Sequence, residues 1–210
     1  MQPNIALYPM KSYRGKRVFD VGVVLLTVPF WIPVAVVTGL VVLWKHGRPV
    51  LFQQERAGYA GRSFRMRKFR TMRDALDADG QLLPDAERIT PFGRWLRSTS
   101  LDELPSLLNV LAGDMSLVGP RPLLTRYVTR YSPRHQQRHL VRPGVTGLAQ
   151  VMGRNALTWA DKFELDVAYV EQCSFWLDLK VLFLTVRTVL VRDGIVAPGD
   201  ATAPEFTGYE

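Results

Sequence analysis

Two adjacent carboxylates are the strongest candidates for chemistry in this chain of 210 residues. Asp102 and Glu103 stand at the start of a leucine-rich segment, where a helix N-terminus would keep Asp102 ionised and available as a nucleophile. Glu103 would then help to hold a divalent cation. A structural interpretation competes with this one, because Ser100 and Glu103 match the S-x-x-E spacing of a capping box. The residues alone do not decide between a helix cap and a catalytic pair.

Two arginines beside prolines indicate a phosphorylated ligand. Arg121 lies between Pro120 and Pro122, and Arg142 precedes Pro143. Because proline restricts the backbone around it, each guanidinium group is oriented in advance. A planar guanidinium group donates two parallel hydrogen bonds to a phosphate or diphosphate. We therefore expect these side chains to bind substrate phosphate.

A second acidic pair, Asp77 and Asp79, forms a D-x-D motif of the kind that holds a divalent metal on a sugar nucleotide. The same residues also form turns, since Asp79 precedes Gly80. The motif supports an alternative function for the chain, that of a metal-dependent glycosyltransferase that releases UDP.

The chain carries 27 Lys and Arg against 19 Asp and Glu, a net charge of +8 at pH 7. This balance predicts an anionic partner such as nucleic acid, phospholipid headgroups or a phosphorylated substrate. A non-enzymatic basic module anchored to a membrane is therefore a further alternative. Nucleic acid is not the expected partner, because the chain lacks the basic helix with interleaved aromatic residues that such modules use.

Residues 21–44 carry no charged side chain and would form a helix of about 36 Å, against about 30 Å for the hydrocarbon core of a bilayer. Basic residues flank this segment on both sides, so a single span would place one basic cluster on the outer face, against the positive-inside tendency. Pro33, with Pro29 before it, would divide the segment into two arms of about half the bilayer thickness. The residues are compatible with both a single span and a re-entrant hairpin.

Periodicity predicts the elements that must position these residues. Alternating polar and apolar residues predict a strand over residues 63–72, with shorter strands at 49–53 and 115–118. Helical patterns are expected over residues 90–97, 101–111, 123–138, 158–172 and 175–191. The last helix is expected either to pack in the core or to lie in a membrane interface.

Several strings, taken in order, resemble those of one family. They are K-R-V-F-D at 16–20, K-F-R-T-M at 68–72, S-L-D-E-L-P at 100–105, N-V-L-x-G-D-M-S-L-V-G-P-R-P at 109–122, R-P-G-V-T-G-L-A-Q-V at 142–151, G-R-N at 153–155 and L-D-L-K at 177–180. Their order and spacing resemble the bacterial sugar transferases called monotopic phosphoglycosyl transferases, and most of all the small, PglC-like members.

The resemblance implies transfer of a sugar 1-phosphate from a UDP-sugar to a polyprenyl phosphate, usually undecaprenyl phosphate, with release of UMP. Mg²⁺ is the implied cofactor, and the small members imply an N-acetylated amino sugar as donor. By this likeness the reaction is ping-pong and passes through a covalent phosphosugar on Asp102, with Glu103 and Lys68 as further catalytic residues. Asp102 and Glu103 are the implied metal ligands. The residues expected to bind substrate phosphate or nucleotide are Arg121, Arg142, Arg154 and Asp178.

The expected fold is α+β and mostly helical. An N-terminal re-entrant membrane hairpin, broken at Pro29 and Pro33, would occupy residues 1–48. A small cytosolic catalytic domain with interfacial amphipathic helices would span residues 49–192, and a tail residues 193–210. The protein would then sit on phospholipid at the cytoplasmic face of a bacterial inner membrane and initiate the assembly of a membrane-bound glycoconjugate.

Two positions depart from the family pattern. The family's Ser-Pro helix break falls on Ile32 and Pro33, so the usual hydroxyl group is missing there. The family's Asn-Arg-Pro-Gly turn reads E-R-A-G at residues 55–58.

Overall fold

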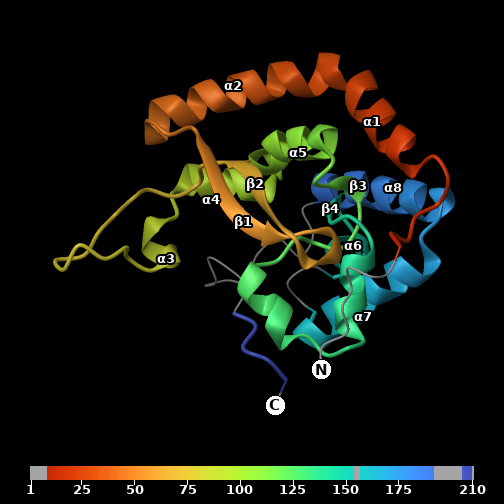
Figure 1. Ribbon diagram of the computed structural model, residues 1–210. Coiled ribbons are helices and arrows are strands. Elements are labelled where there is room, and N and C mark those ends of the chain that lie inside the picture. Colours follow the sequence, from red (N-terminus) through yellow and green to blue (C-terminus); the bar gives the residue numbers. More distant parts are fainter. Residues whose placement is uncertain (1–8, 154–156, 192–204, 210) are drawn as a thin grey trace.

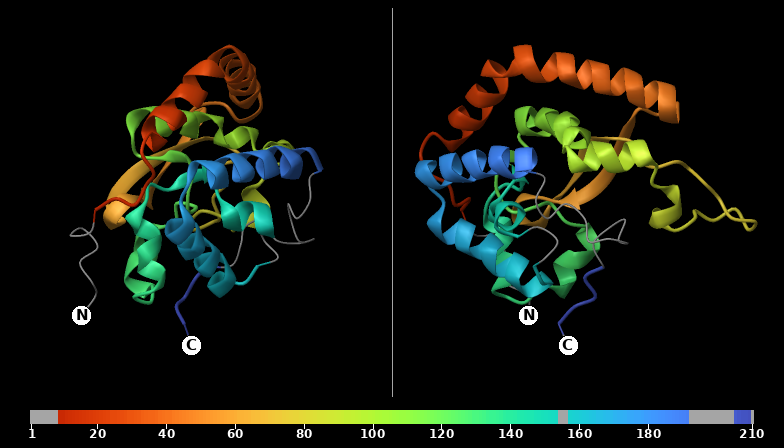
Figure 2. Two further views of the ribbon diagram at one scale, coloured as in Figure 1. Left: turned by 90° about the vertical axis from the view of Figure 1, so that its right-hand side faces the viewer. Right: turned by 180° about the vertical axis from the view of Figure 1, so that it is seen from behind.

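The computed structural model describes residues 9–153, 157–191 and 205–209. Within these residues the chain is mostly helical and holds two small sheets of two strands each, which confirms the α+β class. Figure 1 shows a long bent helix, α1 with α2, lying along one side of a domain built around a β-hairpin. The loop around α3 (Asp85–Arg88) projects from the end of the domain opposite α1, as Figure 1 and the right-hand view of Figure 2 show.

The bend in the apolar segment lies at Thr27, between α1 (Lys16–Leu26) and α2 (Val28–His46). Pro29 is in the first turn of α2, where its missing N–H costs little. Pro33 lies inside α2, so the prediction that Pro33 divides the segment is wrong. The arms are correspondingly unequal, with 11 residues in α1 and 19 in α2.

Side chains satisfy the carbonyl groups that the bend frees. The Thr27 hydroxyl donates to the Val23 carbonyl at 2.7 Å, and the Trp31 indole N–H donates to the Val24 carbonyl at 3.1 Å. Thr27 therefore supplies, five residues earlier in the chain, the kind of hydroxyl group that is missing at Ile32. Backbone carbonyls at a bend need such partners wherever water is excluded.

The hairpin pairs β1 (Leu51–Ala57) with β2 (Ser63–Phe69) in antiparallel register, from Leu51 opposite Phe69 to Ala57 opposite Ser63. The strand predicted from alternation is thus confirmed, although β1 continues through the residues expected to turn. The reversal comes later, around the short 3₁₀ helix η2 (Tyr59–Gly61). A second, parallel pair joins β3 (Ser116–Val118) to β4 (Gly144–Thr146).

The remaining helices cover the sheets. They are α4 (Pro91–Ser98), η3 (Leu101–Ser106), α5 (Leu107–Ala112), η4 (Thr125–Arg130), η5 (His135–Leu140), α6 (Leu148–Met152), α7 (Trp159–Gln172) and α8 (Phe175–Val191). The last two match their predicted ranges, and α7 begins with a capping box between Thr158 and Asp161. The segment predicted as one helix over residues 101–111 is instead a 3₁₀ turn followed by a short α-helix.

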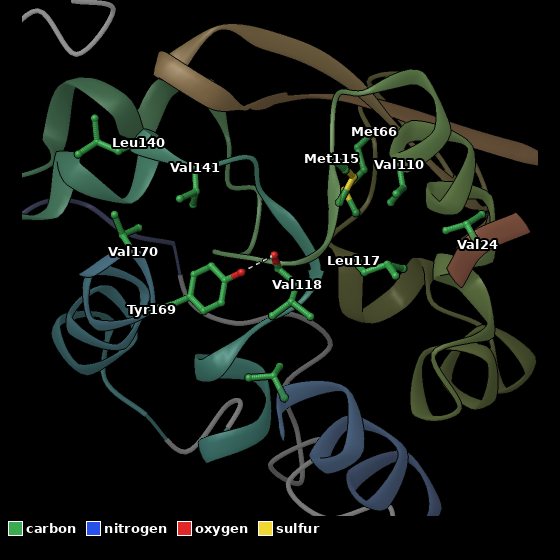
Figure 3. Packing of buried hydrophobic residues seen from close by; sticks show 11 residues of the cluster. Val24, Met66, Val110, Met115, Leu117, Val118, Leu140, Val141, Tyr169 and Val170 are labelled. Carbon is green, nitrogen blue, oxygen red and sulfur yellow. Dashed lines mark hydrogen bonds between the residues drawn. The ribbon is translucent and has the colours of Figure 1, made fainter. Parts of the chain in front are cut away.

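The main core surrounds β3, which α1, α7 and α8 cover (Figure 3). Val118 and Tyr169 lie at its centre, and the Tyr169 hydroxyl donates to the Val118 carbonyl at 2.9 Å. A separate cluster joins α2 to the hairpin and α4 through Val42, Phe69 and Leu96. This cluster fixes α2 against the domain.

Candidate active site

The segment that carries the two carboxylates begins at an unusual backbone conformation. Ser100 has φ 57° and ψ 15°, the left-handed region that ends many helices, and it turns the chain from α4 into η3. Its side chain makes no capping hydrogen bond. The capping-box interpretation is therefore wrong, and the side chain of Glu103 is directed elsewhere.

Glu103 meets two cations at one oxygen. Lys68 Nζ lies 2.6 Å from Glu103 Oε1, and Arg121 Nη2 lies 2.9 Å from the same oxygen. In the described part of the chain, Oε2 of Glu103 accepts no hydrogen bond. Three segments far apart in sequence, β2, η3 and the turn after β3, thus bring their charged residues to one place. Lys68, Glu103 and Arg121, all chosen from the sequence, lie together.

The position of Lys68 depends on a buried amide. Asn109, in α5, is only 1% exposed. Its Oδ1 accepts the N–H of Arg67 at 3.1 Å, and its Nδ2 donates to the Arg65 carbonyl at 2.8 Å. The carboxamide thereby pairs with the edge of β2 much as a peptide group of a further strand would. Because α5 directly follows η3, this pairing fixes the strand of Lys68 relative to Asp102 and Glu103.

The electrostatic environment gives the two carboxylates different pKa values. Burial and the neighbouring Glu103 raise the pKa of Asp102 to about 6, against the opposing effect of Lys68, Arg97 and Arg121. Burial also acts to raise the pKa of Glu103, but Arg121 and Lys68 outweigh it and lower that pKa to about 2. The prediction that Asp102 is ionised at neutral pH agrees with this pKa, although burial and charged neighbours, and not a helix N-terminus, are the causes that set it.

Arg97 is a member of this site that sequence reasoning missed. It lies on α4 and donates from Nε to the Thr71 hydroxyl at 3.1 Å. Its charge acts on Asp102, as the effect on the pKa of that residue shows. The available signal was the basic residue five positions before Asp102, at the end of a helix that must turn sharply into the acidic pair.

The structure places Asp178 in the interior of the domain. This residue is fully buried, and its carboxylate receives Lys16 Nζ at 2.7 Å, the Tyr13 hydroxyl at 2.9 Å and the Tyr169 hydroxyl at 2.7 Å. Lys16 also contacts Asp20 at 3.1 Å. Asp178 therefore joins α8 to the start of α1 in a second buried network, apart from the partners of Glu103. Burial and three donors support a structural role for Asp178, and the substrate role that the resemblance implied stays a prediction.

The other predicted phosphate ligands lie elsewhere. Arg142 donates from Nε to the Gly113 carbonyl at 2.8 Å, beyond the end of α5. Arg154 is outside the described residues. In the projecting loop, Oδ1 of Asp77 accepts the backbone N–H groups of Asp79 at 2.9 Å and of Gln81 at 2.8 Å. The D-x-D motif thus forms the turn that was its structural interpretation.

The acidic pair fits a magnesium ion shared with a substrate. No cluster of three or more acidic, histidine or cysteine ligands occurs among the residues that the structure describes. Mg²⁺ commonly binds through one or two carboxylates together with substrate phosphates, so a complete protein cage is not needed. Asp102 and the open Oε2 of Glu103 are the oxygen ligands available for it.

The apolar neighbours of the pair place it beside the bent helix. Leu101 and Leu104, which flank the two carboxylates, pack with the cluster of Val42, Phe69 and Leu96. The same cluster includes Ala35, from the middle of α2. The acidic pair therefore lies directly under the face that α2 presents to the domain.

Comparisons with known proteins identify relatives of the whole chain. A family described as bacterial sugar transferase matches residues 11–192. EpsL of Bacillus subtilis (strain 168), named an uncharacterized sugar transferase, is 52% identical over 193 residues, covering 92% of this chain and 96% of EpsL. The UDP-glucose:undecaprenyl-phosphate glucose-1-phosphate transferase of Caulobacter vibrioides is 40% identical over 188 residues, covering 85% of this chain and 70% of that protein. The UDP-N-acetylgalactosamine-undecaprenyl-phosphate N-acetylgalactosaminephosphotransferase of Aeromonas hydrophila is 37% identical over 198 residues; these cover 90% of this chain but 47% of that longer protein.

Proposed function

The chain belongs to the bacterial sugar transferase family, and from that premise we propose that it transfers a sugar 1-phosphate from a UDP-sugar to undecaprenyl phosphate. The observation that carries the proposal is the meeting of the Asp102–Glu103 pair with Lys68 and Arg121. Relatives whose names state a reaction support the acceptor and the transferred group. Their names state different sugars, and we propose an N-acetylated amino sugar as the first donor to test.

The proposed mechanism has two displacements. A carboxylate oxygen of Asp102 attacks the β-phosphorus of the UDP-sugar, the bond from that phosphorus to the bridging oxygen breaks, and UMP leaves with the electron pair. A phosphate oxygen of undecaprenyl phosphate then attacks the same phosphorus, and the aspartyl–phosphorus bond breaks. The products are undecaprenyl diphosphosugar and a regenerated carboxylate. A covalent intermediate of this kind lets one site serve a soluble donor and a lipid acceptor in turn.

The charges around Asp102 suit this chemistry. A carboxylate nucleophile and a diphosphate repel each other, and Lys68, Arg97 and Arg121 offset that repulsion. The raised pKa of Asp102 makes its carboxylate a better nucleophile than an ordinary exposed one, while most of it stays ionised at pH 7. Bound Mg²⁺ would supply charge stabilisation for the phosphoryl group, held by Asp102 and Glu103.

We also propose that α1 and α2 lie in one leaflet rather than crossing the bilayer. Of the described helices, α2 alone is long and apolar enough to cross a membrane, and only 11% of it is buried. Its inner face nevertheless packs on the domain at Ala35 and Val42. At Gly39 the approach is close, since a Cβ added there would lie 3.4 Å from Cε1 of the Phe69 ring. Because a polar domain packs along half of this helix, a helix perpendicular to the bilayer plane would carry that domain into the hydrocarbon core.

The helix α8 would add to the same membrane surface. Trp176 is 75% exposed and Phe183 is 72% exposed, whereas Val181 and Asp178 are buried in the domain. An exposed aromatic and aliphatic face on one side of a helix is typical of interfacial binding. This arrangement supports a monotopic protein whose site lies at the depth of the lipid phosphate. The cytoplasmic face of a bacterial inner membrane is the location we propose, since UDP-sugars are cytosolic substrates.

The nucleotide product tests the reaction. The purified protein is incubated with Mg²⁺, undecaprenyl phosphate and each of several UDP-sugars, and the nucleotides are separated. We expect UMP, lost in Asp102→Asn and retained in Asp77→Asn, which changes the D-x-D motif by the same chemistry. Release of UDP, or loss of product in Asp77→Asn only, would support the glycosyltransferase alternative. Salt-sensitive binding to an anionic partner, with no nucleotide product, would support the non-enzymatic alternative.

Accessibility tests the topology separately. Labels at Lys11 and Arg48 flank the bent helix on its two sides. We expect a membrane-impermeant reagent to reach both from the cytoplasmic face of inverted vesicles. Labelling from opposite faces would establish a span.

A further inference from the structure

Arg56 is a cation near the proposed site that the mechanism does not use. It is the last residue but one of β1, in the E-R-A-G string that replaces the family's usual turn. The N–H of the next residue, Ala57, donates to the Leu123 carbonyl at 2.9 Å, two residues after Arg121. The strand end is thereby joined to the segment that carries Arg121. Ala57 and Arg121 also line one small pocket, together with Pro120.

Among the residues that the structure describes, the guanidinium group of Arg56 has no anionic hydrogen-bond partner. Its Nη2 donates to the neutral side-chain oxygen of Gln54. Its Nε is buried and has no hydrogen-bond partner in the described structure. A buried donor without a partner costs about 1–3 kcal/mol, so its retention indicates a ligand that completes it.

The charges nearby favour an anion. Burial and the charge of Arg121 lower the pKa of Arg56 to about 10, and Glu103 acts on the same group in the opposite direction. Glu103, whose charge acts on both arginines, already receives Lys68 and Arg121 on Oε1. Positive charge therefore exceeds negative charge on this side of Glu103. An anion between the two guanidinium groups would relieve both the repulsion and the unpaired donor.

We propose that Arg56 and Arg121 form a subsite for one phosphate group of a phosphorylated substrate. This inference rests on the proposed function, because the subsite adjoins the acidic pair of that reaction. The planar, five-donor guanidinium group matches a phosphate that is held by two parallel hydrogen bonds. The phosphate comes from the UDP-sugar or from the lipid acceptor, and the two half-reactions distinguish these sources.

The test compares Arg56→Gln and Arg56→Lys with Arg62→Gln, an exposed arginine at the other side of the same hairpin turn. UMP binding is measured by calorimetry, and KM is measured for the UDP-sugar and for undecaprenyl phosphate. We expect Arg56→Gln to weaken binding or raise one KM by about tenfold or more, as for a lost charge-assisted hydrogen bond. Arg56→Lys keeps the charge without the fork and should recover only part of the effect. A raised donor KM with weaker UMP binding assigns the donor phosphate; a raised acceptor KM alone assigns the lipid phosphate.

A second variant guards against loss of folding. Gln54→Glu leaves Arg56 in place but gives it a carboxylate partner, so it should also weaken phosphate binding while the melting temperature is kept. Unchanged UMP binding and unchanged KM values in Arg56→Gln, or equal changes in Arg62→Gln, would overturn the proposal. If no UDP-sugar is turned over, the proposed function has failed, but titration with inorganic pyrophosphate still tests the subsite. Pyrophosphate binding that is the same in the wild type and in Arg56→Gln refutes the subsite. Loss of that binding in Arg56→Gln supports the subsite.

Discussion

Replacement of Asn109 tests how the fold positions Lys68. The Asn109 side chain makes three hydrogen bonds, to the N–H of Arg67, to the carbonyl of Arg65 and to Asp114 at 3.1 Å. Each such hydrogen bond contributes about 0.5–1.5 kcal/mol net, and buried partners left unpaired add to the cost. For Asn109→Ala we therefore expect the free energy of unfolding to fall by about 2–4 kcal/mol. In a chain of this size that corresponds to a melting temperature lower by about 5–12 °C.

The effect should reach the chemistry as well as the stability. Lys68 directly follows Arg67, so a loosened strand edge should lower the rate of UMP release at temperatures where the variant is still folded. Asn109→Asp keeps Oδ1 but turns a second oxygen toward the Arg65 carbonyl and Asp114, and should be at least as damaging. Leu108→Ala, at a partly exposed neighbouring position, is the control and should change stability less. A melting temperature of Asn109→Ala within about 1 °C of the wild type would refute this reasoning.

Three further predictions concern the buried network, the nucleophile and the bend. Lys16→Met leaves two buried carboxylates, Asp20 and Asp178, without their cation. We expect a denaturant titration to show a free energy of unfolding lower by about 3–5 kcal/mol, with the KM for UDP-sugar unchanged in the folded fraction. The raised pKa of Asp102 means that its carboxylate gains a proton as the pH falls through about 6. The rate of UMP release, measured by stopped flow, should therefore be constant above about pH 7 and fall about tenfold per pH unit well below pH 6. A rate that stays constant down to pH 5 would contradict the assignment of Asp102 as the nucleophile. Thr27→Val removes the hydroxyl that bonds the Val23 carbonyl and should destabilise the bend, seen as greater proteolysis of the protein in lipid nanodiscs, whereas Thr27→Ser should behave as the wild type.

Local patterns predicted those elements whose apolar residues recur with the period of a strand or a helix. The alternation over residues 63–72 predicted β2, and helical stripes predicted α7 and α8 to within a residue or two. The same rules failed over residues 123–138, where the structure has two 3₁₀ helices, η4 and η5, in place of one α-helix. Tertiary contacts there outweigh helix propensity, as the buried pair of Arg138 with Asp166 at 2.7 Å illustrates.

The acidic pair and Arg121 were singled out from residue type and spacing, and Lys68 from the resemblance, and the structure places Lys68, Glu103 and Arg121 together. Sequence could not reveal that Ser100 adopts a left-handed conformation, which decides between a cap and a charged site. Nor could it show that Asp178 joins α8 to α1, because that role depends on a long-range partner, Lys16. The same limit explains why the prediction that Pro33 divides the apolar segment was wrong. That prediction used residue type alone, whereas the hydroxyl and indole hydrogen bonds lie at the bend at Thr27.

The most direct test of the account is the state of Asp102 after reaction with the donor alone. The protein is mixed with Mg²⁺ and a UDP-sugar that supports turnover, without acceptor, then denatured and analysed by mass spectrometry. We expect one equivalent of UMP and one phosphosugar group on the peptide that contains Asp102, with neither in Asp102→Asn. The group should be discharged when undecaprenyl phosphate is added before denaturation. UMP formed only in the presence of acceptor, with no mass added to that peptide at any time, would rule out Asp102 as the covalent nucleophile.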